Sequence, residues 1–154
     1  MTELDLLLTQ IDQAYNRRSW HGTNLRGSIR GLTPAQAVQR PAPRRHNIQE
    51  LIVHCAYWKY VVARRLTGEK RGSFPLKGSN WFAREAADSA ALREDVRLLG
   101  ACHRRLRATI AKLDATALRA PAADSKPAHW LVSGIIAHDL YHAGQIQLLK
   151  RMIV

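Results

Sequence analysis

The chain has 154 residues, 46% hydrophobic and 23% charged, which is typical of a single globular domain over residues 1–154 and excludes a disordered chain. Lysine and arginine outnumber aspartate and glutamate by 24 to 12, so the net charge of +12 raises the question of an anionic partner. Cys55 and Cys102 are too few and too far apart for a disulfide framework, no apolar run is long enough for a membrane span, and the acidic N-terminus is unlike a signal peptide, so we expect a cytoplasmic protein that does not enter a membrane.

The spacing of apolar residues predicts four amphipathic helices, and the first covers about residues 3–30. Arg18 and Gly22 interrupt its apolar stripe, so we expect a bend near Gly22. Residues 31–45 contain three prolines, which disfavour a helix interior, and this stretch is predicted to be a connector.

The second predicted helix runs from an N-cap at Asn47 to Leu66, and Gly68 stops it. The 21 residues from 68 to 88 have no clear period and are predicted to form a long loop. Loops of this length are usually functional or disordered, and the aromatic residues here favour packing over disorder, namely Phe74, Trp81 and Phe82.

The last two helices have the most regular stripes. The third begins near Ser89 and has inward positions at Leu92, Val96, Leu99, His103, Leu106, Ile110 and Leu113. After a second loop with Pro121 and Pro127, the fourth has them at Leu131, Ile135, His138, His142, Gln145, Leu149 and Met152. No segment alternates with a period of two, so the sequence predicts an all-α fold, a four-helix bundle with long interhelical loops.

Three successive inward positions of the fourth helix are polar: His138, His142 and Gln145. Each buried polar side chain costs about 1–3 kcal/mol unless it finds a partner. Residues four apart lie one above the other on a helix, so the two histidines can direct ring nitrogens at one point, and His54 on the second helix can supply a third ligand. The spacing equally fits hydrogen-bonded core histidines, and the residues alone leave both interpretations open.

At these residues the chain resembles the DinB/YfiT-like family of metal-dependent four-helix proteins, over nearly its whole length. GIIAHDLYHAGQIQLLKR at 134–151 is similar to the family's closing helix, and HNIQELIVHCAYWKYVVARRLTGE at 46–69 resembles its second helix. LRGSIRGLTPAQAVQRPAP at 25–43 is similar to the first interhelical stretch, and Trp81 also suits the family.

The resemblance implies that His54, His138 and His142 bind a divalent metal at one end of the bundle, usually in a homodimer. Nickel and zinc are the expected metals, with manganese and iron as the other candidates. Relatives of known activity include bacillithiol S-transferases and a mycothiol-dependent maleylpyruvate isomerase. The implied partners are therefore a small-molecule substrate and a low-molecular-weight thiol.

No catalytic acid or base can be named, because the predicted inward stripes contain no carboxylate. Gln145 and His103 are the candidates: Gln145 orients a ligand or bonds a neighbouring helix, and His103 is a hydrogen-bonded core residue or faces substrate. We expect the Glu50 carboxylate, in the first turn of its helix, to interact favourably with the helix dipole. We expect Asp139 to form a surface ion pair and Cys55 to be buried and inert.

Three neutral imidazoles leave coordination positions open for water or a thiol. The leading hypothesis is a thiol-dependent S-transferase, with a metal-dependent hydrolase as the alternative. Two non-enzymatic alternatives are a dimeric module that metal only stabilises and a basic nucleic-acid-binding bundle. The basic residues form scattered doublets without a stacking array of aromatics, so we expect a solvated arginine-rich surface and no nucleic-acid partner.

Overall fold

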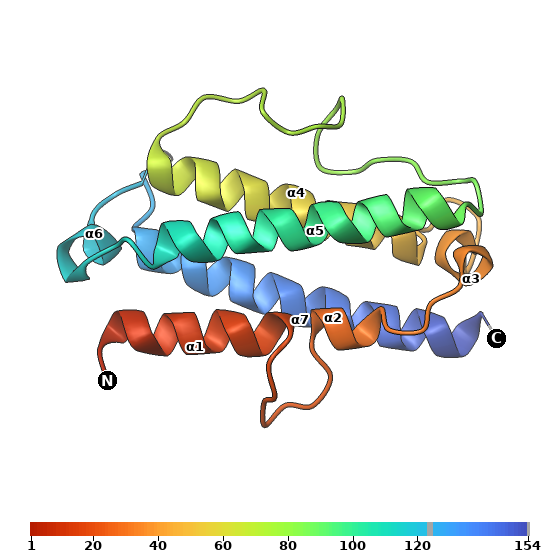
Figure 1. Cartoon of the computed structure of the whole chain (residues 1–154), viewed down its shortest axis with the longest axis horizontal. Coiled ribbons are helices and arrows are strands. Elements are labelled where there is room, and N and C mark those ends of the chain that lie inside the picture. The colour runs from red at the N-terminus through yellow and green to blue at the C-terminus, as the bar shows by residue number, and fades with distance from the viewer. Residues whose placement is uncertain (123–124, 154) are drawn as a thin grey trace.

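The computed structural model describes residues 1–122 and 125–153 and contains a bundle of long helices joined by long loops (Figure 1). Within these residues there is no β-strand, and only an isolated bridge joins Pro121 to Pro127. The helices are α1 (Glu3–Tyr15), α2 (Leu25–Ser28), α3 (Pro34–Val38), α4 (Ile48–Thr67), α5 (Ser89–Ile110), α6 (Ala115–Arg119) and α7 (Ala128–Met152). The predicted all-α bundle is confirmed.

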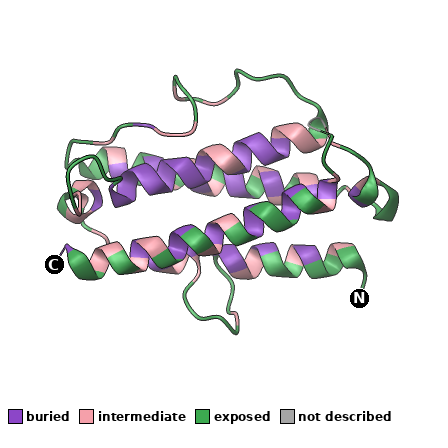
Figure 2. Ribbon diagram, turned by 180° about the vertical axis from the view of Figure 1, so that it is seen from behind, coloured by how far each residue is buried: buried purple, intermediate pink, exposed green. Residues whose placement is uncertain are grey.

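The long helices form a ring. Helix α4 packs on α5 and on α7, and α1 packs on α7 and on α5, while α2 continues the row of α1 along α7. The groove between α1 and α5 therefore lies across the bundle from the groove between α4 and α7. Helix α5 is in front of α4 in Figure 1, and α4 and α7 face the viewer in Figure 2. None of the helices in the described part of the chain has the length and apolar character needed to cross a membrane.

The prediction of one helix over residues 3–30 is wrong. Helix α1 ends at Tyr15, and the chain loops out before α2 begins at Leu25 (Figure 1). Gly22 has φ +91°, a conformation that breaks a helix, and the Asn24 side chain accepts the Gly27 N–H to start α2. The intervening residues offer few apolar side chains, so a helix there would have no face to bury.

The ends of α4 lie where the sequence predicts them. Asn47 is the N-cap and forms a capping box with Glu50, and Gly68 closes the helix at φ +72°. The predicted connector 31–45 contains a short helix, α3. Pro34 is compatible with this helix because it lies in the first turn, where the backbone N–H that proline lacks would have no intrahelical partner. The loop 68–88 packs its aromatic side chains against α4 and each other, as Tyr57, Phe74 and Phe82 show.

The buried stripe of α7 is rotated by about one residue from the predicted one. Met152 is 60% exposed, and Gln145 and Leu149 are half-buried. The fully or nearly fully buried positions beyond the first turns are Val132, Ile135, Ile136, Asp139, His142, Ala143 and Ile146. His138 is half-buried and His142 is 5% exposed, and His142 lines a cavity. The buried residues of α4 and α7 face the interior of the bundle (Figure 2).

Candidate metal centre

Three histidines from two helices bring their Nε2 atoms together. His138 Nε2 lies 3.1 Å from His54 Nε2 of α4 and 3.1 Å from His142 Nε2, one turn further along α7. A metal with ligand nitrogens at about 2.0–2.1 Å would place neighbouring nitrogens about 2.8–3.4 Å apart, from octahedral to tetrahedral geometry. Both spacings match those of neighbouring ligands on one cation, and the ligand atoms of all three histidines lie within 4.8 Å of one another.

The outer nitrogens of two rings of this triad have partners that fix their protonation, whereas His138 Nδ1 is buried without a hydrogen bond in the described part of the chain. His54 Nδ1 lies 2.9 Å from the Asn80 carbonyl oxygen, which only accepts, so the proton is on Nδ1. His142 Nδ1 lies 2.7 Å from Gln145 Oε1 and donates to it in the same way. The Nε2 lone pairs of these two rings are therefore both directed at His138 Nε2, which has at most one proton to give. A cation satisfies all three nitrogens, so the donor set fits a divalent metal.

Burial keeps these imidazoles neutral. It lowers the pKa of His54 to about 4 and that of His138 to about 3, and it also lowers the pKa of His142. Neutral imidazole is the form that binds a metal, so the triad does not have to lose protons at neutral pH.

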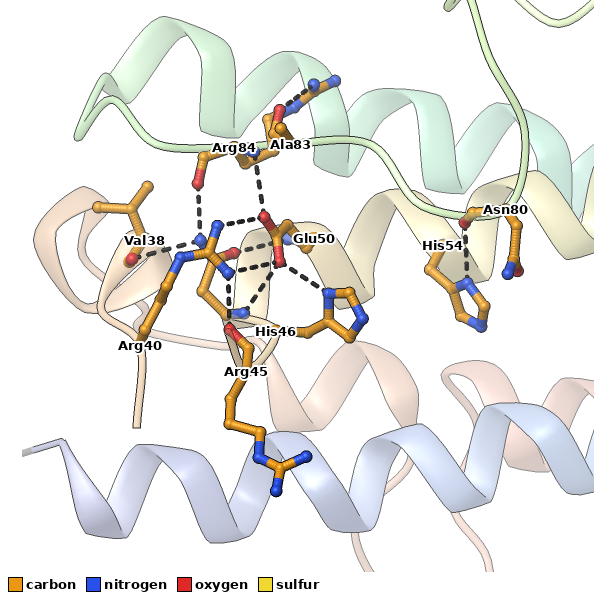
Figure 3. Close-up of polar contacts among 10 residues, drawn as sticks. Val38, Arg40, Arg45, His46, Glu50, His54, Asn80, Ala83 and Arg84 are labelled. Atoms are coloured by element: carbon orange, nitrogen blue, oxygen red, sulfur yellow. Dashed lines mark hydrogen bonds and ion pairs between the residues drawn. The ribbon is translucent and has the colours of Figure 1, made fainter. Parts of the chain in front are cut away.

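The long loop between α4 and α5 supplies the outer partner of His54. Asn80 has φ +64°, and its carbonyl points toward the His54 ring (Figure 3). Trp58 Nε1 donates to Asn80 Oδ1 at 2.9 Å. The Trp81 ring stacks on His54 at 3.9 Å and on His46 at 3.5 Å. The sequence indicated a packed, functional loop but not that Asn80 would orient a histidine.

Glu50 fastens two loops to the start of α4. Arg40 donates to both carboxylate oxygens at 3.0 and 2.6 Å, and His46 Nδ1 lies 3.0 Å away (Figure 3). The Arg84 backbone N–H reaches it at 3.4 Å. Burial raises the pKa of Glu50, but the bonds from Arg40, His46 and the Asn47 backbone N–H outweigh it and hold the pKa below its usual value. Glu50, which the sequence predicted to interact with the helix dipole, therefore also connects the start of α4 to Arg40, His46 and the backbone at Arg84.

A buried ion pair joins α4 to α7 behind the triad. Lys59 Nζ donates to Asp139 Oδ2, and both side chains are fully buried, so the expected surface ion pair of Asp139 is wrong. Asp139 also brings a ligand atom within 4.8 Å of one on His138 and of Cys55 Sγ. Burial raises the pKa of Cys55 well above its ordinary value, in agreement with an inert thiol.

A cavity of about 530 Å³ opens beside His142. Its wall is mainly apolar, and no aspartate or glutamate is among the described residues that line it. The residues that line it include Arg45, His46, Trp81, Tyr141, Gln145, Leu148 and Met152.

The two candidate catalytic residues lie in different places. Gln145 lines this cavity and accepts a hydrogen bond from His142, so it orients a ring of the triad. His103 stacks on Tyr15 with ring centroids 3.6 Å apart and lines a separate cavity against α5. It is not among the residues that line the cavity beside His142.

Comparison with known proteins agrees with this architecture. The crystal structure of a conserved protein from Enterococcus faecalis superposes with a TM-score of 0.72 over 99% of this chain and 98% of that one, at 15% identity, which shows a shared fold. No curated protein matches the chain. The sequence matches the DinB superfamily over residues 17–146, which include all three histidines of the triad. The chain therefore belongs to the DinB superfamily.

Proposed function

We propose that this protein is an enzyme that binds one divalent metal through His54, His138 and His142 and transfers a low-molecular-weight thiol to an organic electrophile. The observation that carries the proposal is the convergence of three neutral imidazole nitrogens at the edge of an apolar cavity. Three protein ligands are the number found in catalytic sites, which leave a position open, whereas closed structural sites use four.

An all-imidazole donor set suits zinc or nickel better than manganese, which prefers oxygen ligands. When bound, such a metal lowers the pKa of a thiol or water that it coordinates, which makes the nucleophile available at neutral pH. The chain's own residues hold the three rings in register through Asn80 and Gln145.

The proposed transfer needs a group that takes one proton from the nucleophile, and no carboxylate is among the described residues that line the cavity. A thiol loses one proton, and His46 can take it, because its Nδ1 donates to the ionised Glu50 and leaves Nε2 free to accept. The sulfur then forms a bond to the electrophilic carbon, and the leaving group departs with the electron pair of the bond that breaks.

Trp81, Tyr141 and Leu148 offer apolar surface for the body of the electrophile. Arg45 adds a positive charge at the same cavity and would attract a substrate that carries a carboxylate. The proposed substrate is thus a small, largely apolar electrophile with an anionic group.

The test is a transfer assay with zinc- or nickel-loaded protein, monochlorobimane as the electrophile, and bacillithiol, mycothiol or cysteine as the thiol. We expect thioether formation above the uncatalysed rate with one of these thiols, and no acceleration by His142→Ala. His46→Gln should keep its metal and lower kcat at least tenfold, since general-base groups typically contribute about 10²–10⁴-fold. His21→Ala, which removes an exposed histidine, is the matched control.

Two outcomes would replace this proposal. Metal-dependent release of nitrophenol from p-nitrophenyl acetate without any thiol would favour the hydrolase. Loss of thermal stability in the triad variants, with no turnover of either substrate by the wild type, would favour a module that metal only stabilises.

We also propose a homodimer. Tyr141, Leu148 and Met152 are large, exposed and on one face of α7, at 64%, 60% and 60% exposure. A partner copy seated on this face would cover the cavity that these side chains line. Sedimentation should show a dimer that Leu148→Glu converts to a monomer; a wild-type monomer would contradict this.

A further inference from the structure

A second cavity, of about 690 Å³, lies in the groove between α5 and the row formed by α1 and α2. This groove is across the bundle from the histidine triad, on the face nearest the viewer in Figure 1. Its floor includes the buried side chains of Tyr15, Ile52 and His103. We call it the arginine pocket, after the four arginines that line it, Arg26, Arg93, Arg97 and Arg104.

The positive charge of the arginine pocket is poorly compensated. No aspartate or glutamate lines it, and of its four arginines only Arg97 has an ion-pair partner, Glu94, among residues 1–122 and 125–153. Elsewhere the acids are committed to other cations, as in Arg107–Asp12 and the buried Lys59–Asp139 pair. Like charges gathered without a counter-charge repel one another, so this region attracts an anion.

The floor of the arginine pocket contains a buried polar atom without a partner in the described part of the chain. His103 is 4% exposed, and its Nδ1 is buried with no hydrogen bond in the part of the chain that the structure describes. Burial lowers the pKa of His103 to about 3, so the ring is neutral and retains one donor and one acceptor nitrogen. Buried polar groups in folded proteins are almost always hydrogen-bonded, so an unpaired imidazole at the edge of a cavity indicates a missing partner.

A glycine makes room in the arginine pocket. Gly100 lies in the middle of α5, where glycine lowers helix stability. A Cβ there would come 3.3 Å from Arg104 Nη1 and 3.6 Å from the Tyr15 hydroxyl oxygen. The missing side chain thus leaves space for a guanidinium and a phenol that both line the cavity.

We propose that the arginine pocket binds a small organic oxyanion with a planar apolar body. Arg26, Arg93 and Arg104 hold the oxyanion, because guanidinium groups donate paired hydrogen bonds to phosphate or carboxylate. The apolar body enters over Ile52 and the stacked rings of Tyr15 and His103. This site is independent of the triad and of the reaction proposed there.

The test is an NMR and calorimetric titration of the metal-free protein with phenyl phosphate, benzoate and the neutral analogue phenol. We expect phenyl phosphate or benzoate to shift the backbone amides of Gly100 and His103 and to bind at least tenfold more tightly than phenol. Whichever anion binds more tightly identifies the oxyanion. His142→Ala should bind the anion as the wild type does, which separates this site from the triad.

Two variants and a control sharpen the test. Arg104→Gln should weaken anion binding about tenfold, the effect of losing one charge-assisted contact. Gly100→Ala should also weaken it while keeping the fold, since alanine favours the helix and the nearest atom is the end of a flexible side chain. Arg151→Gln, which removes an exposed arginine of α7, should change affinity less than twofold.

The proposal is overturned if phenol binds as tightly as the anions, or if the shifts appear at Tyr141 and His142 instead. Equal loss in Arg104→Gln and Arg151→Gln would mean attraction to the overall charge and not a site. Tight binding of a single-stranded oligonucleotide that weakens equally in both variants would assign the basic surface to nucleic acid and also overturn it.

Discussion

The two grooves of this bundle differ in how many of their polar groups have partners. Between α4 and α7, His54 is hydrogen-bonded to Asn80, His142 to Gln145 and Lys59 to Asp139. Of the triad and this ion pair, only His138 Nδ1 and Asp139 Oδ1 are buried without a partner in the described part of the chain. Between α1 and α5, the arginine pocket gathers guanidinium groups and an imidazole that have few partners in the described chain.

The contrast indicates two kinds of binding site. Hydrogen bonds to the outer ring nitrogens fix the direction of the inner ones, as a metal with strict geometry requires. Unpaired like charges around a cavity repel one another and lower the stability of the folded protein. Binding of a flexible anionic ligand would restore that stability.

Breaking the ion pair beneath the triad should have the largest effect on folding. Lys59→Met leaves the Asp139 carboxylate buried without a partner, and we expect a loss of about 3–5 kcal/mol in the free energy of unfolding. The double variant Lys59→Met/Asp139→Leu should recover most of that loss. Urea denaturation measures both, and the exposed pair serves as control, since Arg97→Gln should cost at most about 1 kcal/mol. A loss below that in Lys59→Met would contradict the buried pairing.

Removing an outer partner of the triad should weaken metal binding without abolishing it. Gln145→Leu leaves His142 Nδ1 without its acceptor, and we expect zinc affinity to fall about 10–100-fold. A competition titration with a chromophoric chelator measures this. Gln147→Leu, two residues along the same helix and outside the triad, is the matched control. Unchanged affinity in Gln145→Leu would show that the hydrogen bond does not orient the ring.

The neutral histidines make stability depend on pH. His103 has its native pKa lowered to about 3, so between that value and the ordinary 6.5 the unfolded chain binds a proton that the folded chain does not. Stability is therefore lost as the pH falls below about 6.5, by up to about 1.4 kcal/mol per pH unit for this residue.

The measurement is urea denaturation of metal-free protein from pH 7 to pH 4. The His103→Phe variant keeps an aromatic ring against Tyr15 and should flatten the slope by close to one proton, whereas His21→Ala should not. A wild-type stability that is constant over this range would refute the neutral burial of these rings.

The smallest expected effect is a gain. Arg93→Gln removes one charge from the arginine pocket, and we expect it to stabilise the ligand-free protein by a few tenths of a kcal/mol. Raising the salt concentration should reduce that gain, because salt screens exposed charges. Destabilisation by Arg93→Gln in thermal denaturation would mean that this guanidinium has a structural partner.

Local signals explain which parts of the fold were predictable. The N-cap at Asn47 and the stop at Gly68 follow from short-range rules, and both are found. Most of the predicted stripe of α5 is also buried, but Val96 is half-buried and Leu113 lies beyond the end of the helix. The four-residue spacing of His138 and His142, together with His54 on another helix, was enough to predict which three histidines lie together. The break after Tyr15 was missed because an irregular apolar stripe looked like a bend, although Gly22 and Asn24 are signals for a loop and a new helix.

Features that depend on the path of the chain could not be predicted. Lys59 and Asp139 are 80 positions apart, and the sequence around each one alone predicts an exposed charged side chain. The Asn80 carbonyl reaches His54 from a loop whose end is bound at Arg84 by Glu50 and Asn47. The arginine pocket combines residues from α1, α2, α4 and α5, which no local pattern connects.

The metal content of untagged protein tests the central claim most directly. Elemental analysis of wild type, His142→Ala and His21→Ala, all purified in parallel, should find about one zinc or nickel per chain in the wild type and the His21 variant. The His142 variant should hold far less, because one of its three ligands is gone. Equal metal in all three proteins, or none in the wild type after incubation with either ion and removal of the excess, would contradict the triad as a metal site.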